Sequence, residues 1–95
     1  MSRVEEEYFL ACEKLCVPDE VYDYALENEI DLLDSSEWMD LGLENLIAWR
    51  KNIKEKKGFY YQDYVTAELN CCINKILIDL KEYQIWISPN TAYQN

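Results

Sequence analysis

The feature that most restricts how this chain can fold is its shortage of turn residues. Its 95 residues include only two glycines and two prolines, too few for the many tight turns of a small β-sandwich. Apolar residues instead recur every three or four positions, which is the period of an amphipathic helix. We therefore predict one all-α domain over residues 1–95, a compact four-helix bundle with short connections. The predicted helices span about 2–16, 19–33, 36–57 and 60–86, followed by a mobile C-terminal tail at 88–95.

Start and stop signals support these limits. Pro18 ends the first helix and, with the acids after it, begins the second, because proline fits the first helical turn and acids favour its positive end. Asp34 and Glu37 have nearly the spacing of a capping box for the third helix. Gly58 follows a run of lysines and should end that helix as a left-handed cap.

Helical spacing also predicts which side chains are buried. The apolar face of the second helix holds Val21, Tyr22, Ala25, Leu26, Ile30, Leu32 and Leu33. The third presents Trp38, Leu41, Leu46, Trp49 and Ile53, and Met39, Leu43 and Ile47 widen this face. The fourth has a main face of Val65, Leu69, Cys72, Ile73, Ile76, Leu77, Leu80 and Tyr83, and nearly opposite it a second stripe of Tyr64, Ala67, Cys71, Ile78 and Ile85. A helix that is apolar on two sides is either central in its bundle or half-covered by another chain.

The residue inventory argues against catalysis. The chain has no histidine, which removes the commonest general base and metal ligand. Gly42 and Gly58 are the only glycines, so no glycine-rich phosphate loop can form. No D-x-(D/N)-x-(D/N)-G run is present, so an EF-hand calcium loop is not expected either. We therefore expect no enzyme activity and no cofactor.

The four cysteines, Cys12, Cys16, Cys71 and Cys72, are expected to be buried thiols in a reducing compartment. A four-thiolate zinc site is a weaker alternative, because neighbouring residues on a helix point about 100° apart. No apolar run approaches the roughly 18 residues of a membrane span, and the acidic start does not resemble a secretory signal. We therefore predict a cytoplasmic protein with no metal and no membrane contact.

Charge is distributed very unevenly. The net charge is −10, and residues 1–47 hold 14 acids but only 2 bases. From Leu15 to Trp49 there is no lysine or arginine. Ten acids occur in that stretch: Asp19, Glu20, Asp23, Glu27, Glu29, Asp31, Asp34, Glu37, Asp40 and Glu44. Such a surface would repel phosphates, so direct nucleic-acid binding is not expected.

Five of these acids should share one face of the second helix. A helical wheel places Glu20, Asp23, Glu27, Asp31 and Asp34 within an arc of about 80°, beside Tyr24. One interpretation is an anionic surface for a basic protein partner. The other is a solvated face that only aids solubility. Tyr60 and Tyr61, before the fourth helix, should leave at least one ring exposed as a partner anchor.

In charge, size and helix content the chain resembles the small acidic inhibitors of nucleic-acid enzymes, such as colicin-nuclease immunity proteins and phage-encoded nucleic-acid mimics. The Tyr60-Tyr61 pair is similar to a paired-tyrosine feature of the immunity proteins. No segment beyond this pair aligns with them. The resemblance implies an immunity, antitoxin or anti-defence (for example anti-CRISPR) inhibitor that occludes the basic groove of a nucleic-acid-acting protein. The alternative is a self-associating or adaptor bundle, a homodimer in the simplest case, that uses the second stripe of the fourth helix.

Overall fold

The computed structural model describes residues 3–87, and side chains over residues 5–81. It contains α1 (Arg3–Lys14), α2 (Asp19–Glu27), the 3₁₀ helix η1 (Ser35–Leu41), α3 (Leu43–Lys57) and α4 (Tyr64–Ile87). No strand occurs in this part of the chain. The all-α prediction is therefore confirmed for the described residues, and the predicted tail at 88–95 lies outside them.

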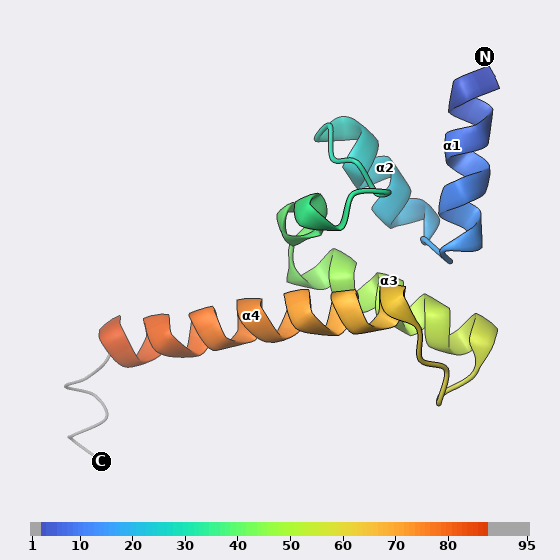
Figure 1. Cartoon of the computed structure of the whole chain (residues 1–95). Coiled ribbons are helices and arrows are strands. Elements are labelled where there is room, and N and C mark those ends of the chain that lie inside the picture. The colour runs from blue at the N-terminus through green and yellow to red at the C-terminus, as the bar shows by residue number, and fades with distance from the viewer. Residues whose placement is uncertain (1–2, 88–95) are drawn as a thin grey trace.

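The helices are arranged around a central pair, α3 and α4 (Figure 1). The helices α1 and α2 and the short helix η1 lie on one side of this pair, and α1 runs across it. The second half of α4 extends beyond the other helices. The predicted four-helix bundle is not confirmed, because the helices cross and the third predicted helix is two separate elements.

Two tryptophans hold the core together. Trp38 from η1 and Trp49 from α3 are almost completely buried, and their rings pack edge to face with centroids 4.7 Å apart. Trp38 Nε1 donates to the Leu32 carbonyl (2.9 Å) and Trp49 Nε1 donates to the Leu15 carbonyl (2.8 Å). Each indole therefore satisfies a backbone acceptor in a connection between helices, which a buried connection requires.

The helix α2 ends at Glu27 rather than at Leu33 as predicted, because the chain turns in a Schellman motif. Glu29 adopts a left-handed backbone with φ 56°, and the Ile30 amide donates to the Ala25 carbonyl (2.8 Å). Glycine usually occupies the left-handed position. With glutamate there, the sequence carries no visible stop signal.

The helix α1 ends in the same way. Cys16 is left-handed with φ 61°, and the Val17 amide donates to the Cys12 carbonyl (3.1 Å). The predicted end at Cys16 is therefore two residues too late, since the last helical residue is Lys14.

The predicted third helix is divided at Gly42, whose φ of 86° is unfavourable for residues with a Cβ. The Asp34 carboxylate caps η1 by accepting from the Ser36 amide (3.0 Å), as its capping position predicted. The Glu37 carboxylate accepts from the Asp31 amide (3.2 Å) instead of completing a capping box. The five residues of the predicted main face are buried. Of the three predicted to widen it, Met39 and Leu43 are partly buried, but Ile47 is exposed.

The last connection spans residues 58–63. Gly58 ends α3 with a positive φ of 106°, so the predicted stop is confirmed. The helix α4 begins at Tyr64 rather than Tyr60, because Asp63 caps it by accepting from the Thr66 amide (2.9 Å).

Replacing Glu29 with glycine should stabilise the protein. A non-glycine residue in a left-handed conformation costs roughly 1 kcal/mol, so Glu29→Gly should raise the free energy of unfolding by about that amount in urea denaturation. Asn28→Gly is the matched control, since Asn28 has φ −105° and donates its side chain to the Tyr24 carbonyl. Equal effects of the two substitutions would contradict the assignment of strain to Glu29.

Candidate partner-binding surface

Three of the predicted acids share one exposed face of α2. Glu20, Asp23 and Glu27 are separated by three and four residues, so they lie above one another along the helix. All three are exposed, and none of their carboxylates takes part in a hydrogen bond or ion pair within the described residues. Tyr24 follows Asp23 and is 38% exposed. We call Glu20, Asp23 and Glu27 the α2 acidic face.

Asp31 and Asp34 do not belong to that helix face, which corrects the five-acid arc predicted from sequence. Both follow the end of α2, and both carboxylates accept hydrogen bonds from nearby residues in the α2–η1 region. Asp31 Oδ1 accepts from the Leu33 amide (2.9 Å). Asp34 Oδ1 accepts from the hydroxyl and the amide of Ser36, and these bonds hold the pKa of the Asp34 carboxyl below its usual value. Both carboxylates nevertheless remain on the surface.

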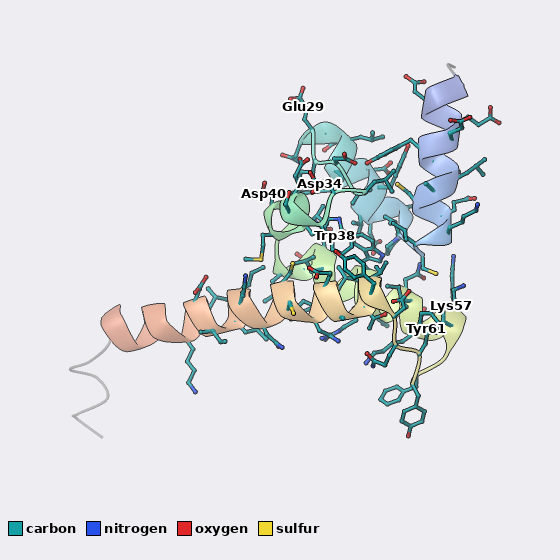
Figure 2. The ribbon with its side chains drawn as sticks, viewed as in Figure 1. Glu29, Asp34, Trp38, Asp40, Lys57 and Tyr61 are labelled. Atoms are coloured by element: carbon teal, nitrogen blue, oxygen red, sulfur yellow. The ribbon has the colours of Figure 1, made fainter. Side chains whose placement is uncertain are left out.

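The acids extend from α2 across η1. Figure 2 shows Glu29, Asp34 and Asp40 along one side of the molecule, whereas Lys57 lies at the far end of α3. The cations of α3 contact residues other than these acids. Arg50 donates to Asn70 (3.0 Å), Lys54 lies over the Phe59 ring and Lys57 lies over the Tyr61 ring. Over residues 5–81 no lysine or arginine pairs with an acid of residues 19–44.

The predicted tyrosine anchors lie away from these acids. Tyr60 is 88% exposed, whereas Tyr61 is half-buried and donates its hydroxyl to Asp63 (3.0 Å). Tyr61 and Lys57 lie together, far from Glu29 (Figure 2). The structure therefore does not bring this pair to the α2 acidic face.

The predicted second stripe of α4 is exposed. Tyr64 and Ile78 are 67% and 55% exposed, and Ala67 and Cys71 are also exposed. The side chain of Ile85 lies outside the described ones. On the main face Val65, Leu69, Cys72 and Ile73 are buried as predicted, but Leu77 and Leu80 are exposed. Ile76 is partly buried, so α4 is uncovered on both apolar sides from Leu77 to Leu80.

The cysteines form no disulfide within the described residues. Cys12, Cys16 and Cys72 are buried, as predicted, whereas Cys71 is exposed. Burial raises the pKa of the Cys12 thiol to about 11, so Cys12 is neutral at pH 7. In this part of the chain no acidic and cysteine side chains converge as a metal site would need. None of the helices described has the length and apolarity to cross a membrane.

Two apolar residues near the end of α2 are exposed, contrary to the sequence prediction. Leu26 and Leu33 were predicted on the buried face of the second helix, but they are 56% and 48% exposed. Leu33 leaves that face because α2 has already ended, and Glu29 reaches the surface at the same turn. No motif in the sequence marks this turn.

No known protein family matches the chain, and no characterised protein or solved structure is significantly similar to it.

Proposed function

We propose that the chain is an acidic inhibitor of the immunity, antitoxin or anti-defence type. It binds a basic protein, most simply a nuclease or another nucleic-acid-acting protein, and occludes the groove that holds nucleic acid. The mechanism is steric and electrostatic, so it needs no catalytic group, metal or cofactor.

The observation that carries this proposal is the absence of counter-ions. Across the described residues, the α2 acidic face is exposed and no lysine or arginine pairs with it. Like charges four residues apart destabilise a helix by a few tenths of a kcal/mol. A binding role would offset that cost, because a basic partner supplies the missing cations.

The spacing of the acids supports a nucleic-acid-like surface. A rise of about 1.5 Å per residue separates Glu20, Asp23 and Glu27 by about 4.5 and 6 Å along the axis. This is the same order as the charge spacing of a nucleic-acid strand, about 3.4 Å along its axis. Negative potential of this kind also accelerates encounter with a cationic groove, and salt weakens the effect.

Free buried thiols support action in a reducing compartment. We therefore propose that the protein acts in the cytoplasm.

Neutralising the α2 acidic face should weaken inhibition. The triple variant Glu20→Gln, Asp23→Asn, Glu27→Gln removes the exposed charges and leaves the capping carboxylate of Asp34 in place. Proteins from the source cell that bind heparin at low salt would be passed over immobilised protein. We expect captured protein to bind the variant at least about tenfold more weakly, with a shallower salt dependence.

The matched control removes three exposed acids elsewhere, through Glu13→Gln, Glu55→Gln and Asp79→Asn. It makes the same change in net charge on α1, α3 and α4. Equal loss of affinity in both variants would mean that only net charge matters. Unchanged affinity in the α2 variant would refute the proposal.

A second candidate function, self-association, is favoured by a stretch of exposed apolar side chains on α4. Leu77, Ile78 and Leu80 are each about half exposed on a part of the helix that extends beyond the other elements (Figure 1). Pairing of two copies through α4 would cover these residues.

Substitution of Ile78 tests this candidate. Sedimentation should show a dimer that Ile78→Glu converts to a monomer, because the charge would be buried without a partner. Ile47→Glu, at an exposed isoleucine of α3, is the control and should leave the dimer intact. A wild-type monomer at 100-micromolar protein would refute self-association.

A further inference from the structure

A hollow in the surface lies at the C-terminal end of α2, and the acids that line it are Glu29 and Asp31. It lies between α1 and the connection from α2 to η1, and its volume is about 340 Å³. Tyr8 and Ile30 form part of its lining, and Ile30 is buried. We call this hollow the α2 groove.

Two large apolar side chains project beside this groove. Leu26 and Leu33 line it and are 56% and 48% exposed, although the apolar residues Val21 and Ala25 of α2 are buried. Apolar side chains that are exposed together in a concave site lose unfavourable contact with water when a partner covers them.

The charged lining of the groove is acidic. Glu29 and Asp31 are its charged residues, and no lysine or arginine lines it within the described part of the chain. Glu29 has a left-handed backbone, and its side chain extends outward from the turn (Figure 2). An occupant therefore has to be apolar where it meets the leucines and cationic where it meets the carboxylates.

The groove is held in shape before any partner arrives. The Tyr8 hydroxyl accepts from the Leu32 amide (2.8 Å), which ties α1 to the connection. Burial raises the pKa of Tyr8 to about 12, so the hydroxyl stays neutral. Asp31 Oδ1 accepts from the Leu33 amide (2.9 Å), which fixes the Leu33 backbone. A preformed site loses less conformational entropy on binding.

We infer that the α2 groove receives a basic amphipathic segment of the partner protein, in which one large apolar side chain is flanked by lysine or arginine. This inference rests on the proposed function and specifies how the partner is recognised. The apolar side chain packs between Leu26 and Leu33, and the flanking cations meet Glu29 and Asp31. Two copies of this chain do not pair groove to groove, because both linings are acidic.

Synthetic peptides test the inference on the full chain. The first has two lysines on each side of a central leucine, and the second has serine in place of that leucine. NMR titration should shift the methyl signals of Leu26 and Leu33 with the leucine peptide, which should bind about tenfold more tightly than the serine peptide. The double variant Leu26→Ser, Leu33→Ser should lose this preference. Leu10→Ser, at a similarly exposed leucine of α1, should keep it.

The outcomes separate this inference from the proposed function. Equal affinity for the two peptides, with binding that still depends on the α2 acidic face, would overturn the groove and leave the inhibitor proposal standing. A leucine preference that survives in the double variant would also overturn the groove. No methyl shift at millimolar leucine peptide would do the same. A leucine preference without any effect of neutralising the α2 acidic face would support the groove and count against electrostatic inhibition.

Discussion

The paired indoles of Trp38 and Trp49 are the contact on which the arrangement of the helices depends. Their rings meet edge to face at 4.7 Å, and their N–H groups donate to the Leu32 and Leu15 carbonyls. Those carbonyls belong to the connections that follow α2 and α1. The pair therefore anchors both connections onto α3, and loss of either donor would leave a buried acceptor unsatisfied, at a cost of about 1–3 kcal/mol.

This anchoring separates the charges of the molecule. With the α2–η1 connection held by Trp38, Glu29, Asp34 and Asp40 lie on one side, and Lys57 at the end of α3 lies far from them (Figure 2). The helix dipole explains part of the pattern, because acids favour helix starts and lysines favour helix ends. It does not explain Asp23 or Glu27, which lie beyond the first turn of α2. These two residues are the strongest reason to regard the acidic surface as functional.

Sequence patterns predicted the helices and most of the core, because apolar spacing and the Gly58 cap are local signals. Trp38, Leu46 and Ile53 are buried as the helical wheel required, even though Gly42 divides their segment. The end of α2 could not be predicted, since a left-handed glutamate has no characteristic sequence. Because α2 ends at that turn, Asp31 and Asp34 do not lie on the helix face, and Leu33 is exposed. The exposure of Leu77 and Leu80 depends on where the other helices end, which periodicity does not report.

Within the described part of the chain, no cation neutralises the charge carried by the acids of α2. Urea denaturation at low and at high ionic strength measures this directly, because salt screens repulsion between like charges. The free energy of unfolding should rise with salt, and it should rise less in the double variant Asp23→Asn, Glu27→Gln, which removes one repulsive pair on α2. A free energy of unfolding that falls with salt, by the same amount in both proteins, would show that these carboxylates are already paired and would contradict the account.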